Sequence, residues 1–173
     1  MKKALVDELK DFLKDRKKVV VVGVGNEMRG DDGVGIAVAK MLKKRIAEEA
    51  AVLIGGTAPE NITGKIKRLH PSHLIFVDAA DFGGSPGEVM VASPATIAWR
   101  TISTHTLPLS VISEYLMKET GVKVLLLGIQ VEQSVFGSGM GQKVAKAAEK
   151  VAEILEEVLQ KKRTLFRRRA GRR

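Results

Sequence analysis

The chain has no cysteine, and none of its hydrophobic runs approaches the length of a membrane span. The absence of cysteine excludes a disulfide framework, a thiolate zinc site and a cysteine nucleophile, and it fits a reducing compartment. Charged residues occur within the first seven positions, too early for the apolar core of a signal peptide. We therefore expect a cytoplasmic protein with no membrane insertion.

Aromatic residues are also scarce, at 4% of 173 residues, so the core must be built mainly from Val, Ile, Leu and Ala. The apolar content of 45% is ordinary for a globular protein. The length is that of one domain with a sizeable core. These features indicate a compact domain of the size of a small enzyme.

Apolar, β-branched runs alternate with amphipathic stretches along the chain. This pattern predicts strands at 18–24, 51–54, 74–77, 88–92 and 122–129, and helices at 3–16, 33–44, 57–69, 107–118 and 143–159. The alternation predicts an α/β fold, a single-domain three-layer α/β/α sandwich around a mostly parallel, twisted sheet. Thr57 and Glu60 have the spacing of a capping box at the start of the third helix.

We divide the chain into an N-terminal amphipathic helix (1–17), a main domain (18–160) and a basic C-terminal tail (161–173). The tail contains eight Lys or Arg and no acid, so it accounts for most of the net charge of +9. It has one aromatic residue and no repeated aromatic–basic pattern for stacking on bases, which argues against nucleic acid as a partner. We expect a flexible end, with partner docking or nonspecific polyanion binding as alternatives.

The most informative segment runs from Val19 to Gly35, where an apolar run ends in glycines and a pair of acids opens a helix. In an open α/β sheet, ligands bind at the carboxyl ends of the strands. A dinucleotide site needs a third glycine where Met28 stands, and Asp31 and Asp32 would repel a pyrophosphate. The segment therefore excludes a nucleotide site and indicates a metal or acid–base site.

Polar side chains follow three of the predicted strands at the edge where a ligand would bind. They are Asp31 and Asp32 after the first strand, Asp78 and Asp81 after the third, and Gln130 after the last, while His105 precedes a helix. Two carboxylates and an imidazole at one edge could hold a divalent cation such as zinc or nickel. The same trio could instead act as a general acid–base set.

The four acids also have structural interpretations. Asp31 has the position of a helix N-cap, Asp32 that of a first-turn acid that complements the helix dipole, and Asp81 that of a turn cap. Asp78 is the hardest to explain in this way, because an acid at the end of a buried strand costs stability unless it is used. The sequence alone leaves both interpretations open.

Other catalytic patterns are absent from the sequence. His70 and His73 lie at the amino end of the third predicted strand, away from the candidate site, and we interpret both as structural. There is no G-x-S-x-G elbow and no H-E-x-x-H helix. A serine hydrolase of the α/β type and a zincin-type protease are therefore excluded.

The chain resembles the NiFe-hydrogenase maturation endopeptidases in seven blocks that occur in the same order. These blocks are Gly23–Asn26, Gly30–Gly35, Gly55–Asn61, Phe76–Asp81, Pro86–Glu88, Ser103–Leu109 and Leu127–Gln130. They span about residues 18–160; each is modest alone, and together they are specific. The Thr-His-x-x-Pro-Leu and Gly-Ile-Gln blocks are most similar to the hydrogenase 3 branch, which serves formate-hydrogenlyase-type complexes.

The resemblance implies a phosphorylase/hydrolase-like fold and an endopeptidase. Such an enzyme removes a C-terminal extension from the precursor of a NiFe-hydrogenase large subunit after nickel insertion. The metal-contacting residues of the family carry over onto Asp32, Asp78 and His105, with nickel brought by the substrate rather than held permanently. Asp32 and Asp78 are the implied catalytic acids. Asp31, Asp81 and Gln130 are weaker candidates for contacts with the substrate.

The resemblance leaves two mechanisms and several other functions open. Nickel in the precursor could act as a docking point and Lewis acid, or one acid could activate water as a general base. A nickel-dependent chaperone would bind the precursor without cutting it. A small hydrolase with its own catalytic zinc is a further alternative.

Overall fold

The computed structural model describes residues 2–46, 50–96, 100–101 and 108–160. Their strands form one six-stranded sheet with the order β2-β1-β3-β6-β4, and β5 pairs with β3. The strands are β1 (Val19–Val24), β2 (Ala51–Gly56), β3 (His73–Asp81), β4 (Val89–Ala92), β5 (Arg100–Thr101) and β6 (Lys123–Gln130). The four strands β1, β2, β3 and β6 are parallel, while β4 and β5 run antiparallel to their neighbours.

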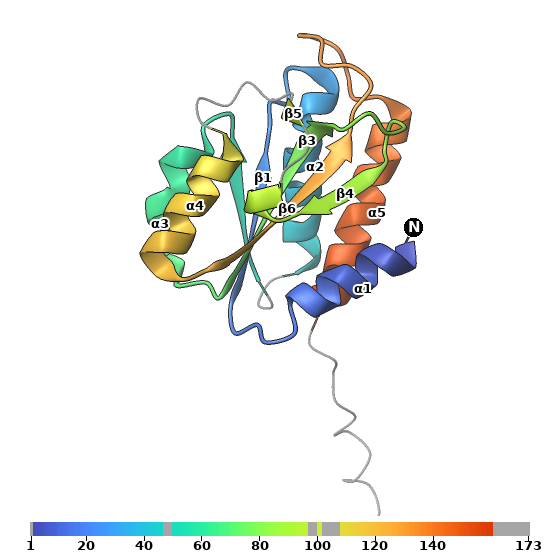
Figure 1. Ribbon diagram of the computed structural model, residues 1–173. Helices are drawn as coiled ribbons and strands as arrows, with labels where there is room; N and C mark the ends of the chain where they lie inside the picture. The colour runs from blue at the N-terminus through green and yellow to red at the C-terminus, as the bar shows by residue number, and fades with distance from the viewer. Residues whose placement is uncertain (1, 47–49, 97–99, 102–107, 161–173) are drawn as a thin grey trace, which may run out of the picture.

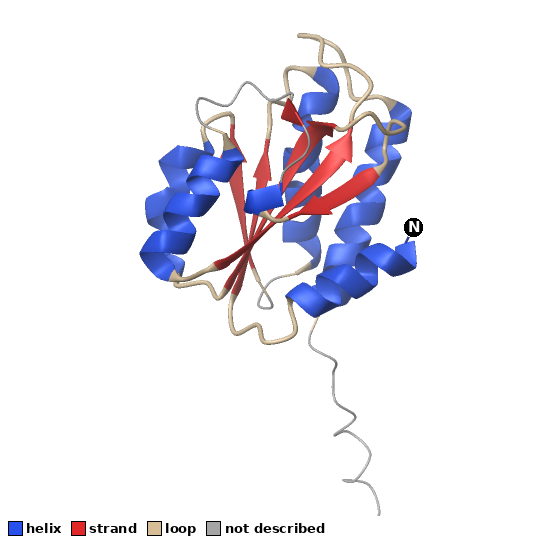
Figure 2. Cartoon of the chain, in the orientation of Figure 1, coloured by secondary structure: helices blue, strands red, loops and turns tan. Residues whose placement is uncertain are grey.

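Helices cover both faces of the sheet (Figures 1 and 2). They are α1 (Lys2–Phe12), α2 (Val34–Arg45), α3 (Thr63–Leu69), α4 (Leu109–Thr120) and α5 (Gln142–Leu159). Short 3-10 helices lie at Gly30–Gly33 (η1), Pro59–Ile62 (η2) and Pro94–Thr96 (η3). The α1, α2 and α5 helices pack on one face, and α3 and α4 pack on the other. The predicted three-layer α/β/α sandwich is therefore confirmed.

The central strand β1 shows why its sequence is uniformly apolar. Val19 and Val21 belong to the core on the side of α2 and α5, whereas Val20 and Val22 belong to the core on the side of α3 and α4. All four side chains are almost fully buried. A parallel strand that is covered on both faces needs apolar residues at successive positions, not at alternate ones.

The N-terminal helix belongs to the same core as the rest of the chain. Leu5, Val6 and Leu9 of α1 are buried and pack in the cluster that α5 also lines. The helix ends at Phe12, earlier than the predicted residue 16. The basic tail at 161–173 lies outside the described residues. Within the described part of the chain, no helix combines the length and the apolar character that crossing a membrane requires.

Two local predictions were wrong. The strand predicted at 74–77 is longer, because β3 continues through Asp78 to Asp81 while the small, buried Ala79 and Ala80 keep pairing with β6. The capping box at Thr57 is absent, since the chain begins η2 at Pro59 and no side-chain cap bond is made there. Proline has a fixed φ that suits the first position of a helix, and this sets the start one residue later than a Thr57 cap requires.

Candidate functional site

Asp32 and Asp78 lie on adjacent elements at the carboxyl edge of the sheet. Strand β1 leads into η1, which contains Asp32 and lies against β3, the neighbouring strand that contains Asp78. Asp32 is 0% exposed and Asp78 is 2% exposed. One Asp78 oxygen accepts a 2.9 Å hydrogen bond from the N–H of Ala79. Two buried acids therefore come from neighbouring elements at the edge where parallel α/β sheets bind ligands.

Glycines allow the helix start to lie directly on the strand ends. A Cβ atom on Gly35, in the first turn of α2, would overlap the carbonyl oxygens of Val24 and Val77. Gly25 has a φ of 133°, and a Cβ there would overlap the carbonyl oxygen of Asp32. Only glycine permits these contacts. Gly35 therefore brings the start of α2 against the β3 peptide that precedes Asp78, and Gly25 brings the end of β1 against the backbone of Asp32.

The loop between β1 and η1 is bonded to the backbone of Asp32 at both ends. The N–H of Asn26 donates to the Asp32 carbonyl at 3.2 Å, and the N–H of Asp32 donates to the Arg29 carbonyl at 3.2 Å. Within the loop, the N–H of Met28 donates to the Asn26 side chain at 2.9 Å. These bonds fix the position of Asp32 before any ligand binds.

Asp31 holds two distant segments together. Its carboxylate accepts hydrogen bonds from the backbone N–H groups of Glu132 at 3.0 Å, Gln133 at 3.1 Å and Gly141 at 2.7 Å. The residue is 0% exposed. The predicted N-cap role is wrong, because Arg29 is the N-cap residue of η1 and no side-chain cap bond is made there. Asp31 is therefore a structural clamp between these segments, and its contact with a substrate stays a prediction.

Gln130 and Asp81 brace the loop after β3. The Gln130 side-chain oxygen accepts hydrogen bonds from the N–H groups of Phe82 at 2.9 Å and Gly84 at 3.1 Å, and its nitrogen donates to Asp81 at 3.2 Å. Asp81 also accepts a 3.2 Å bond from the N–H of Gly83, which supports the interpretation of Asp81 as a turn cap. These bonds give both residues a part in shaping the site, and their contact with a substrate stays a prediction.

The histidine at the opposite edge of the sheet has a structural environment. His73 is 1% exposed, its Nδ1 lies 2.9 Å from the Ser72 hydroxyl, and its ring packs edge-on against Phe12. Its Nε2 lies 3.3 Å from the Asp15 carboxylate. Burial lowers the pKa of His73, and the attraction of Asp15 opposes that shift only in part. This agrees with the structural role expected for His73.

His105, the third member of the predicted metal-contacting trio, lies outside the described residues. Within the described ranges, no three His, Cys, Asp or Glu side chains gather in a way that could hold a metal ion. Asp32 and Asp78 are two carboxylates, which are suitable but incomplete donors for a divalent cation. A metal at this edge would need at least one further donor.

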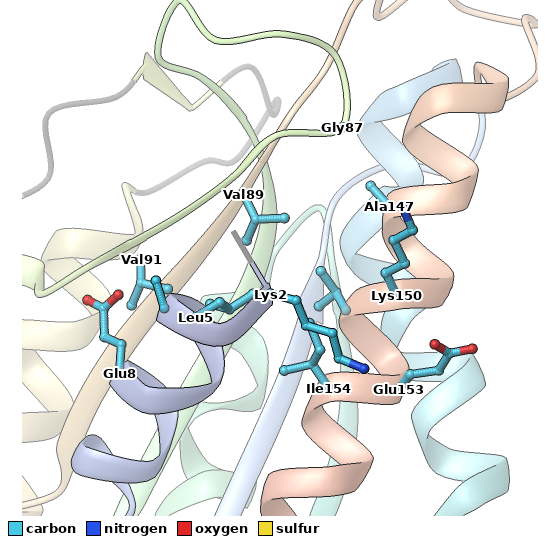
Figure 3. Close-up of a pocket in the computed structure, with 12 residues that line it drawn as sticks. Lys2, Leu5, Glu8, Gly87, Val89, Val91, Ala147, Lys150, Glu153 and Ile154 are labelled. Carbon is cyan, nitrogen blue, oxygen red and sulfur yellow. The ribbon is translucent and has the colours of Figure 1, made fainter.

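A cavity of about 420 Å³ lies elsewhere, between α1, β4 and α5 (Figure 3). Leu5, Val89, Val91 and Ile154 contribute apolar walls, and charged side chains of α1 and α5 also line it. Neither Asp32 nor Asp78 reaches this cavity. Because the acids are absent from it, the carboxyl edge of the sheet remains the candidate site.

The chain is similar to known proteins of one family. A family model for hydrogenase maturation proteases (HycI) matches residues 36–158. The hydrogenase 3 maturation protease of Escherichia coli K12 is 38% identical over 138 residues, which cover 79% of this chain and 88% of that protein.

Two solved structures have the same fold. The crystal structure of the NiFe hydrogenase maturation protease HycI from Thermococcus kodakarensis superposes with a TM-score of 0.82 at 34% identity, over 89% of this chain and 99% of that chain. The solution structure of the endopeptidase HycI from Escherichia coli gives a TM-score of 0.74 at 36% identity, over 82% of this chain and 90% of that chain.

Proposed function

Because the chain belongs to the hydrogenase maturation protease family, we propose that its substrate is the nickel-loaded precursor of a NiFe-hydrogenase large subunit. In this proposal the enzyme removes the C-terminal extension of the precursor. The observation that carries it is the pair of buried acids, Asp32 and Asp78, on neighbouring elements at the carboxyl edge of the sheet. The class of reaction is inferred from the relatives, and the two carboxylates are groups that can take part in it.

The donor chemistry at this edge suits nickel carried by the substrate. Asp32 and Asp78 offer carboxylate oxygens, and His105 would add an imidazole nitrogen from the Ser103–Leu109 block. This mixed oxygen and nitrogen set matches a borderline divalent cation. Burial of the two acids lowers the local dielectric and strengthens their attraction to a cation. A precursor that lacks nickel would not gain this attraction, so the same residues would select the loaded form.

The acids then have two tasks in the proposed reaction. By contacting the metal centre of the precursor, they hold the adjoining peptide at the sheet edge in one orientation. Nickel in the precursor supplies Lewis-acid polarisation when it is bound. One of the two carboxylates accepts a proton from the attacking water and returns it to the leaving amine as the C–N bond breaks, so the cut releases a new carboxyl end and the free amino end of the extension. The fixed loop around Asp32 keeps this geometry ready before the precursor arrives.

Cleavage of the large-subunit precursor, with and without bound nickel, tests the proposal. The expected result is a shortened product from the loaded precursor alone, identified by its intact mass. Equal cutting of both forms would contradict the nickel dependence. Nickel-dependent binding with no cutting would indicate a chaperone that binds the precursor, not a protease.

A further inference from the structure

Three large apolar side chains are exposed on two neighbouring loops at the carboxyl edge of the sheet. Met28 follows β1 and is 60% exposed, while Val135 and Phe136 follow β6 and are 57% and 67% exposed. These are the three most exposed of the large hydrophobic residues in the described part of the chain. Contiguous apolar side chains on a surface often mark an interaction site.

The two loops are joined to one another by direct hydrogen bonds. The N–H of Gly137 donates to the Met28 carbonyl at 2.8 Å, and the Arg29 guanidinium donates to the Ser134 carbonyl at 3.2 Å. The Asp31 clamp holds the start and the end of the second loop through backbone N–H groups. Met28, Val135 and Phe136 therefore form one pre-organised surface, which we call the apolar platform.

The apolar platform adjoins the acid pair. Met28 lies in the loop whose two ends are bonded to the backbone of Asp32, and the N–H of Asp31 donates to the Gln133 carbonyl at 3.3 Å. One backbone network thus connects the acid of η1 with both loops of the platform. A polypeptide that reaches Asp32 at this edge comes close to the loop that contains Met28.

We propose that the apolar platform docks an apolar segment of the large-subunit precursor next to the scissile bond. This inference rests on the proposed function and adds a protein-binding surface to the acid site. A second copy of this chain is the less favourable occupant, because a copy seated on the platform would crowd the edge where the acids lie. Val135 and Phe136 have few rotatable bonds, so they lose little conformational freedom when the partner binds, and the flexible Met28 can adapt to it.

The test compares cleavage kinetics and binding for Phe136→Ala, Met28→Ala and the full-length wild type, with nickel-loaded precursor as the probe. Phe136→Ala is expected to raise KM and the dissociation constant about tenfold, the effect of losing one well-packed anchor. Met28→Ala is expected to raise both by a smaller factor. The kcat values should stay within about twofold of wild type, because neither side chain takes part in the chemistry.

Met117→Ala is the matched control. Met117 is also an exposed methionine, at 41%, but it lies near the end of α4 that leads into the amino end of β6. Its removal should leave KM and kcat unchanged. Unchanged melting temperatures in all three variants would exclude loss of fold.

The outcomes separate the docking proposal from the proposed function. If wild type cuts the precursor and all three variants have the wild-type KM, the docking proposal is wrong and the proposed function stands. If wild type binds but does not cut, and the platform variants bind more weakly, docking stands and the protease function fails. If wild type neither binds nor cuts, both fail. A wild-type dimer that Phe136→Ala converts to a monomer would assign the platform to self-association.

Discussion

The Asp31 carboxylate accepts a 2.7 Å hydrogen bond from the backbone N–H of Gly141, 110 residues further along the chain. This bond joins η1 to the residue that precedes α5. The same carboxylate holds the segment that follows β6 through Glu132 and Gln133. Asp31 therefore unites the loops that surround the candidate site, beside the buried Asp32.

Replacing Asp31 with Asn should destabilise the fold. The amide can accept with one atom only, so at least one N–H group of the clamp loses its partner and the added NH₂ faces donors. We expect the free energy of unfolding to fall by about 1.5–3 kcal/mol, the range for hydrogen bonds to a charged group. Denaturant unfolding measures it.

Asp81→Asn is the comparison for that experiment. Asp81 is exposed and accepts bonds in a surface turn, so its replacement should cost less than about 1 kcal/mol. If the free energy of unfolding falls equally in the two variants, the Asp31 clamp stabilises the fold no more than the surface turn at Asp81 does. The Asp31→Asn variant should also cut the precursor more slowly than wild type, because the loops of the site lose the carboxylate that joins them.

Gly35→Ala should disturb the site through the backbone. The new methyl group would overlap the carbonyl oxygens of Val24 and Val77, so the start of α2 must move away from the sheet. Overpacking of this kind costs about 1–3 kcal/mol, and the shift of η1 should lower cleavage at least tenfold. Unfolding curves and precursor cleavage measure the two effects.

Gly64→Ala is a suitable control for Gly35→Ala. Gly64 lies in α3, and an added Cβ would meet only the Arg68 side chain, at 3.6 Å. Alanine favours a helix over glycine by up to about 1 kcal/mol, so this variant should be as stable as wild type or more stable. If both variants lose stability equally, the close approach of Gly35 to the strand ends is not the cause.

His73 should make stability depend on pH in the weakly acidic range. Burial lowers the pKa of His73 in the folded protein below the unfolded value of about 6.5. As pH falls below about 6.5, the unfolded chain therefore binds a proton that the folded chain resists, and the free energy of unfolding decreases. Asp15 lies between His73 and Lys123, and its attraction and the repulsion of Lys123 partly cancel at the ring.

Measuring the free energy of unfolding between about pH 6.5 and 5.5 tests this pH dependence. His73→Gln should flatten the decrease. His70→Asn should retain it, because His70 is exposed and its left-handed backbone, with a φ of 49°, also suits asparagine. A decrease of the same size in His73→Gln would assign it to other groups.

The sequence predicted the layers well because they depend on local periodicity. The valines of β1 indicated a strand buried on both faces, and the structure confirms this. The helix predicted at 107–118 ends only two residues later, where Gly121 readily adopts the observed φ of 71°. These features are encoded within a few neighbouring residues.

The roles of individual polar residues were harder to predict because their partners are distant. The helix-start position of Asp31 suggested a cap, yet its partners are backbone N–H groups more than 100 residues away, which have no sequence signature. Gln130 likewise bonds to a loop 46 and 48 residues earlier. In the sequence Met28 only breaks a glycine motif, whereas its place near Phe136 depends on the tertiary fold. His105 lies outside the described residues, so its predicted role stays a prediction.

The most direct test of the account is the single-turnover rate at which Asp78→Asn and Asp32→Asn cut the nickel-loaded precursor, beside wild type and Asp81→Asn. We expect each site variant to lose about 10²–10⁴-fold in rate, as when a catalytic acid or base is removed, while remaining folded. Asp81→Asn should stay within about threefold of wild type, as expected for a surface turn cap. If Asp78→Asn cuts the loaded precursor at the wild-type rate, the acid pair is not the catalytic centre and the account is wrong.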